Sequence, residues 1–212
     1  MFHLLKGKDK YQVVEKPPVT NPFDQMSEEE AKAFFQWHMD NISPRIHNMC
    51  KLIQFKPDYS EESLIALWRI VIKTYDTVKR EKMSMSTFDS IINCCSLYLG
   101  EVLIRNNSGL HWQCYTDADD INIRSKNMPV IAGFRALIED VQKPMILEPM
   151  KKVYVAKREL TFSAARETAL YDVYKEWQQY SPEKELKRIP STKEKFAAIM
   201  SKCCQGGRQG DG

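Results

Sequence analysis

The sequence predicts an α+β fold that is mostly α-helical, with a small antiparallel β-sheet after the third helix. Two observations carry this prediction. In the first half of the chain, apolar residues recur every three or four positions in segments that begin near residues 28, 60 and 84, which is the spacing of one buried helix face. Residues 110–115 then alternate large apolar or aromatic side chains with polar ones, as a half-buried strand does.

The first helix has a defined start. Ser27 followed by Glu30 matches a capping box, in which each side chain bonds the backbone of the other, so we expect a helix from about residue 28. Its apolar stripe is interrupted at Ser43-Pro44, because proline removes a backbone donor. The pattern is compatible with one kinked helix or with two helices in series.

The next two helices are marked by their ends. Ser60 with two acidic residues after it resembles an N-terminus, and the basic residues near Lys79 suit a C-terminus. The third helix opens at 84–86 and is apolar on most of its surface, which predicts the central helix of the domain. Gly100 within it predicts close packing of another backbone.

After the turn at residues 106–109, three short segments predict a meander: 110–115, 121–124 and 129–134. Residues 135–160 are ambiguous. A helical turn or two would fit 134–141, whereas 153–155 (Val-Tyr-Val) predicts a strand. Helix is expected again over 161–179, and a short one over 192–200.

These elements predict a single globular domain over 27–200. An extended N-terminal arm is expected over 1–26, where prolines favour extended or turn backbone, and a disordered glycine-rich tail over 201–212. The formal net charge of the 212-residue chain, 31 − 28 = +3, is too small for the basic field of a nucleic-acid-binding protein. Because neither a membrane span nor a secretory signal is apparent, we expect a cytoplasmic protein with reduced cysteines and no membrane partner.

Catalytic motifs are missing from the sequence. The four histidines are scattered, no C-x-x-C or H-E-x-x-H pair occurs, and neither a glycine cluster between a strand and a helix nor a G-x-S-x-G elbow is present. We therefore expect no metal, no cofactor and no catalytic residue. The alternative is a small hydrolase or transferase whose active site lacks a motif and uses Glu101, His111 or Cys114, although His111 and Cys114 should point to opposite faces of a strand.

Asp117, Asp119 and Asp120 form an acidic loop between predicted strands. The spacing lacks the glycine and glutamate of a helical calcium loop, so the plain interpretation is a solvated hairpin loop. The alternative is that these three carboxylates bind a partner with a basic surface. His38 is expected to be a half-buried helix residue, and the four tryptophans are expected in the core: Trp37, Trp68, Trp112 and Trp177.

Two stretches carry a family resemblance. Residues 29–38 (EEAKAFFQWH) with 42–46 (ISPRI), and residues 98–103 (YLGEVL) leading through Gly109 to Trp112, resemble small uncharacterised bacterial proteins. Those proteins are similar to immunity-type proteins encoded beside polymorphic toxins, especially in Firmicutes. The resemblance implies a single-domain cytoplasmic protein without catalysis, which neutralises a cognate toxin by occluding its active site or locking its shape.

Overall fold

A computed structural model describes residue 14 and residues 16–80, 82–116, 126–135, 145–162 and 165–182. Within these ranges the chain is mostly helical and carries a small antiparallel sheet after the third helix, so the predicted fold class is confirmed. The elements, in chain order, are a 3-10 helix η1 (Phe23–Gln25), α1 (Glu28–Ile53), α2 (Ser63–Lys79), α3 (Met85–Asn106), β1 (His111–Cys114), β2 (Pro129–Phe134), β3 (Met145–Leu147), α4 (Pro149–Thr161) and α5 (Ala169–Gln178).

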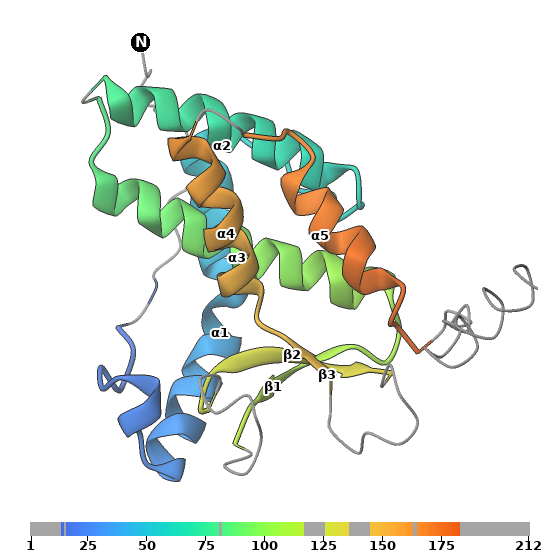
Figure 1. The fold of residues 1–212 in the computed structure, drawn as a ribbon. Helices are drawn as coiled ribbons and strands as arrows, with labels where there is room; N and C mark the ends of the chain where they lie inside the picture. The colour runs from blue at the N-terminus through green and yellow to red at the C-terminus, as the bar shows by residue number, and fades with distance from the viewer. Residues whose placement is uncertain are drawn as a thin grey trace, which may run out of the picture.

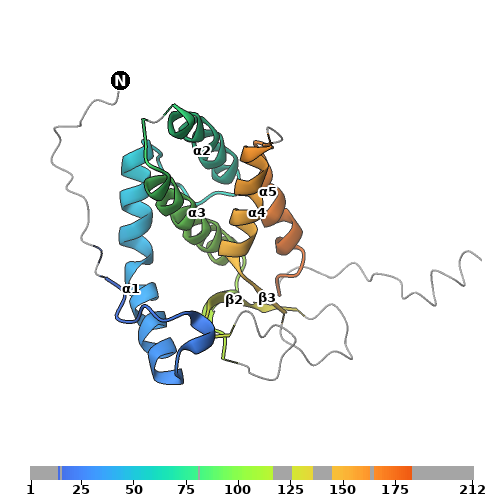
Figure 2. The ribbon, with the colours of Figure 1, turned by 60° about the vertical axis from the view of Figure 1, so that its left-hand side comes forward.

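Helix α3 is the centre of the fold. It runs between α1 on one side and α4 and α5 on the other, and α2 lies alongside it on the side far from the sheet (Figures 1 and 2). The sheet lies at the base of this helical layer, beside the N-terminal half of α1. This arrangement gives one continuous hydrophobic core that joins all five helices to the sheet.

The predicted start of α1 is confirmed. The Glu30 backbone N–H donates to Ser27 Oγ at 3.2 Å, and the Ser27 N–H donates to the Glu30 carboxylate at 2.8 Å, which is the reciprocal capping box. Pro44 lies inside the helix without ending it, so one helix, not two, spans this segment. A single long α1 can therefore contact the sheet near its start and α2 and α3 further along.

The second and third helices begin close to the predicted positions. Ser84 caps α3, since its Oγ accepts a bond from the Thr87 N–H at 3.2 Å. Tyr98 of α3 is fully buried, and its hydroxyl lies 2.8 Å from Ser63 Oγ at the start of α2, which satisfies both polar groups. Among the described residues, α3 is long and apolar enough to cross a membrane, but most of it is buried inside the fold, as in the core helix of a soluble protein.

The sheet has the order β1-β2-β3, and both pairs are antiparallel. Strands β1 and β2 lie where the sequence predicted strands, whereas the predicted strand 121–124 falls outside the described residues. The third strand, Met145–Leu147, comes from the segment left ambiguous. The β2–β3 register shifts between Ile131 and Phe134, and Gly133 within this shift has a φ of 95°.

One prediction for the C-terminal half is wrong, and the start of another is shifted. Residues 153–155 lie within α4 and form no strand, because Val153 packs into the core with Ala156 and Leu160 at helical spacing. The helix expected over 161–179 is present as α5, but it begins only at Ala169, and Thr161 belongs to the preceding helix α4. The predicted helix 192–200 and tail 201–212 lie outside the described residues, as do residues 1–13 of the N-terminal arm.

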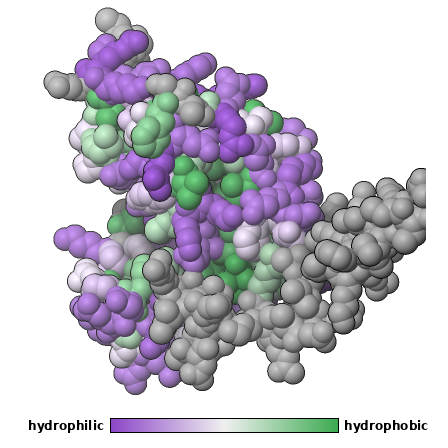
Figure 3. Space-filling view, viewed as in Figure 1, coloured by the Kyte–Doolittle hydropathy of each residue, from purple (hydrophilic) through white to green (hydrophobic). Residues whose placement is uncertain are grey.

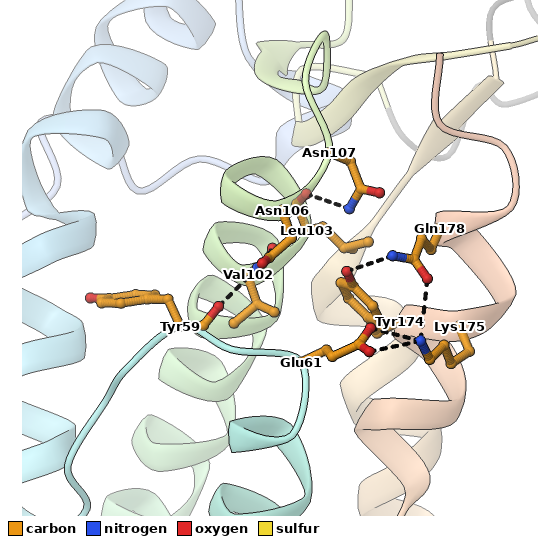
Figure 4. Close-up of polar contacts among 9 residues, drawn as sticks. All are labelled: Tyr59, Glu61, Val102, Leu103, Asn106, Asn107, Tyr174, Lys175 and Gln178. Carbon is orange, nitrogen blue, oxygen red and sulfur yellow. Dashed lines mark hydrogen bonds and ion pairs between the residues drawn. The ribbon is translucent and has the colours of Figure 1, made fainter. Parts of the chain in front are cut away.

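Polar contacts join α5 and the end of α3 to the connection between α1 and α2 (Figure 4). Lys175 of α5 forms an ion pair at 2.7 Å with Glu61, in the segment before α2. The Gln178 side chain donates to the Tyr174 hydroxyl at 2.9 Å. At the end of α3, the Asn106 side chain donates to the Tyr59 carbonyl at 2.8 Å. The Glu61–Lys175 pair and Gln178 lie beside the buried Tyr174 ring, and the Asn106 bond joins the end of α3 to the same α1–α2 connection.

Candidate functional site: an aromatic cavity and an exposed helix face

A cavity of about 130 Å³ lies where α1, α3, the sheet and the start of α4 meet. Its walls are mainly aromatic and aliphatic side chains, with four polar residues among them. The aromatic walls are Phe23, Phe34, Trp37 and Trp112; the aliphatic walls are Leu97, Met128, Pro129, Pro149 and Met150; and the polar residues are His38, Arg45, Ser96 and Glu148. The walls of this one small cavity therefore come from η1, α1, α3, β1, the start of β2 and the start of α4.

Helical and strand periodicity bring these residues together. Phe34, Trp37, His38 and Arg45 recur at helical spacing and share one face of α1. Trp112 comes from β1, where side chains alternate between the two faces of the sheet. The His38 and Trp112 rings meet edge to face, with their centroids 5.3 Å apart. The Phe34 and Phe23 rings also meet edge to face, with their centroids 5.1 Å apart.

Glu101 holds the indole of Trp112 in place. The Trp112 Nε1–H donates to Glu101 Oε1 at 3.0 Å, and Arg105 pairs with the other Glu101 oxygen at 3.1 Å. The same indole packs against Gly100, which corrects the prediction that another backbone would approach this glycine. Glu101 therefore positions a cavity wall.

His38 is more deeply buried than the sequence predicted. Only 6% of the residue is exposed, and its Nε2 atom has no hydrogen-bond partner among the described residues. Burial, followed by the nearby positive charge of Arg45, lowers the pKa of His38 from 6.5 to about 3. The imidazole is therefore neutral at physiological pH, and one buried nitrogen of this cavity-lining residue is unsatisfied.

This depressed pKa predicts a loss of stability in acid. The unfolded chain binds a proton near pH 6.5 and the folded chain only near pH 3, so protonation favours unfolding between these values. The contribution of neutral His38 is complete above pH 6.5 and is lost as the pH falls toward 3, with a slope of up to about 1.4 kcal/mol per pH unit. Urea unfolding of wild type and His38→Leu between pH 7 and 4 should show wild type losing stability relative to the variant. If the free energy of unfolding changed with pH in the same way for both proteins, the lowered pKa of His38 would be contradicted.

A second feature is the outer face of α4, defined by Lys151, Val155, Arg158 and Phe162. These residues follow one another at helical spacing, and all are exposed. Val155 is 55% exposed and Phe162, just after the helix, 72%. The view onto α4 shows hydrophobic patches enclosed by hydrophilic surface (Figure 3). We call this surface the α4 face.

The structure does not bring together the three residues of the enzyme alternative. Glu101 binds Trp112 and Arg105, as described above. The exposed His111 places Nδ1 3.2 Å from the Gly109 carbonyl oxygen, while Cys114 Sγ lies 3.9 Å from the Ala31 carbonyl oxygen of α1. Burial raises the pKa of the Cys114 thiol, which disfavours the reactive thiolate. The expected divergence of His111 and Cys114 is confirmed.

The remaining predicted site residues, Asp117, Asp119 and Asp120, lie outside the described residues. Within the described part of the chain, no three His, Cys, Asp or Glu side chains gather in a way that could hold a metal ion. The four cysteines described there are free thiols, and burial raises the pKa of Cys50 to about 11.

The four tryptophans differ in how deeply they are buried. Trp68 is fully buried, as predicted, whereas Trp37, Trp112 and Trp177 are only partly buried. Sequence reasoning missed the cavity. The signal for it was the run Phe34 to His38, where aromatic residues and a histidine share one helix face, but the partner walls come from distant segments.

Comparison with known protein families gives a match to part of the chain. Residues 23–120 match the model of a family described as "Uncharacterised protein YwmA". This stretch runs from η1 through β1 and includes both motifs of the resemblance, so similarity to an uncharacterised family is confirmed. Searches of curated proteins and of solved structures gave no match. The family description makes no connection to immunity proteins or toxins.

Proposed function

We propose that this protein is a non-catalytic binding protein of the immunity type, which neutralises a cognate bacterial toxin in the cytoplasm by direct protein contact. The observation that carries the binding role is the α4 face. It exposes Val155 and Phe162 on a helix whose opposite side is fully packed into the core. The immunity role rests in addition on the sequence resemblance.

The composition of the α4 face suits a protein interface. Phe162 offers a large apolar side chain that would lose its water contacts on binding, and aromatic residues and arginine are enriched at binding hot spots. The Lys151 Nζ atom lies 3.9 Å from Glu148 Oε1, whereas Arg158 forms no ion pair within the described part of the chain. A complementary partner surface would therefore present an apolar recess next to a carboxylate.

No observation favours the alternative of a small hydrolase or transferase. Glu101, His111 and Cys114 have separate partners, and a nucleophile with its base would need to lie within hydrogen-bond reach.

The experiment is capture of the tagged full-length protein from a lysate of its native host, with bound proteins identified by mass spectrometry at low and moderate salt. The expected result is a stoichiometric partner with a toxin-like C-terminal domain whose activity is suppressed when the purified protein is added. Recovery of the protein alone, while neighbouring genes are expressed, would contradict the proposal. A partner whose activity is unchanged would contradict the immunity role.

The α4 face can be tested in the same assay. Val155→Asp and Phe162→Asp should each weaken partner binding at least tenfold, because each places a charge in an apolar contact. Met85→Asp is the matched control, since Met85 is also an exposed apolar residue, 49% exposed, but lies at the start of α3. Equal binding by all three variants would show that the interface lies elsewhere.

The acidic loop has its own test. If Asp117, Asp119 and Asp120 face a basic partner, reversing Asp119 and Asp120 to lysine should slow association with the captured partner at least tenfold at low salt. Stopped-flow mixing at two salt concentrations measures this rate. An unchanged association rate at low salt would show that the acidic loop is not part of the interface.

A further inference from the structure

We propose that the aromatic cavity is a binding site for a small, neutral, planar aromatic molecule that carries a hydroxyl group, of about the size of phenol. The proposal is independent of the α4 face and of the toxin, because it rests on the cavity walls and on one buried nitrogen.

The size and walls of the cavity define the apolar part of this ligand. The volume is about 130 Å³, and an engineered apolar cavity of about 150 Å³ in another protein holds benzene. Phe34, Trp37 and Trp112 supply ring faces and edges on different sides. Aromatic rings prefer offset or edge-to-face contacts with one another, so a flat ring fits these walls better than a branched aliphatic group.

His38 defines the polar part. His38 lines the cavity, and only 6% of its surface is exposed. Its Nε2 atom has no hydrogen-bond partner in the described part of the chain. A buried polar atom without a partner is costly, so a ligand whose hydroxyl comes within hydrogen-bond distance of Nε2 gains affinity, with a small movement of the ring or its neighbours to admit the contact. A hydroxyl both donates and accepts, and therefore satisfies the neutral imidazole in either tautomer.

Charges on the cavity wall favour a neutral ligand. The Arg45 guanidinium stacks over the Trp37 ring, with Cζ 5.6 Å from the ring centroid, and the Glu148 carboxylate lines the same cavity. Because the wall carries one positive and one negative group, neither a ligand anion nor a ligand cation gains much net attraction there, while either would lose its hydration on entering an apolar cavity. A phenolic hydroxyl avoids this penalty at neutral pH.

A ligand can enter the cavity past the side chain of Met150. This residue lines the cavity, is 36% exposed, and lies in the first turn of α4. An unbranched methionine side chain changes rotamer readily, so entry of a small ring needs no movement of the helix backbone.

The test titrates the full-length protein with phenol and with toluene, which has the same size but no hydroxyl. Binding is followed by tryptophan fluorescence, because Trp37 and Trp112 line the cavity. We expect saturable binding of phenol, with an affinity at least tenfold above that of toluene. His38→Leu should abolish this preference, while His47→Leu, a change on the same helix outside the aromatic cavity, should leave it intact.

A second measurement does not depend on the variant folding. In wild-type protein labelled with ¹⁵N-histidine, phenol should shift the His38 Nε2 resonance and toluene should shift it much less. Absence of saturable phenol binding, equal affinity for phenol and toluene, or an unmoved His38 Nε2 resonance at saturating phenol would each overturn the proposal.

Discussion

Gly100→Ala should lower the free energy of unfolding by about 3 kcal/mol, at the upper end of the cost of overpacking a core. Inside a helix, replacement of glycine by alanine normally stabilises by about 1 kcal/mol, so the expected effect has the opposite sign. The reason is the Trp112 indole, whose Cζ2 atom would lie 2.2 Å from the new Cβ. Since the Trp112 Nε1–H is bonded to Glu101, the ring cannot move away without losing that hydrogen bond.

Urea unfolding of a double-mutant cycle identifies the cause. Trp112→Phe removes Cζ2 and its neighbours, so Gly100→Ala should cost much less in that background than in wild type. Ser90→Ala, at an exposed position of the same helix, is the matched control and should change stability by less than about 0.5 kcal/mol. An equal cost of Gly100→Ala in both backgrounds would show that the indole is not the obstacle.

Gly133→Ala should be more damaging, with a loss of about 4 kcal/mol or failure to fold, because two separate penalties add. The residue has a φ of 95°, a backbone conformation that costs an alanine energy. In addition, the new Cβ would lie 2.2 Å from the Gly109 carbonyl oxygen, a backbone atom that cannot rotate away.

Gly109→Ala provides the matched control. Gly109 also has a positive φ, 84°, but a Cβ there would first meet the Pro182 side chain, at 3.0 Å. This variant should therefore show the conformational penalty with little collision, about 1–2 kcal/mol by chemical denaturation. A cost for Gly133→Ala no larger than that for Gly109→Ala would contradict the backbone collision.

The parts of the fold that were predictable from sequence are those determined by local chemistry. Ser27 with Glu30, and Ser84 before α3, fix helix starts through bonds within one turn. The strand predicted at 153–155 failed because Val-Tyr-Val favours a strand locally, whereas the wider spacing of Val153, Ala156 and Leu160 favours a helix packed on α3. Tertiary packing overrode local preference there.

The candidate site was less predictable because its parts are distant in sequence. The face of α1 that carries Phe34 and His38 was visible as a helix stripe, but nothing in that stripe shows that Trp112 and Met150 close a chamber over it. Gly100 was recognised as a point of close approach, yet sequence could not distinguish an indole from a backbone as its neighbour. The α4 face could not be predicted because residues 153–155 were expected to form a strand, whereas they lie in α4.

The central place of α3 has a consequence for biosynthesis. Helix α4 packs against α3 more extensively than any other helix does, and α5 also contacts it, but both are translated after the sheet. The most apolar of the described helices therefore leaves the ribosome before α4 and α5, which cover it, have been made. Nascent chains that stop after the sheet carry this surface uncovered and are prone to aggregate, so productive folding of the domain awaits completion of its C-terminal half.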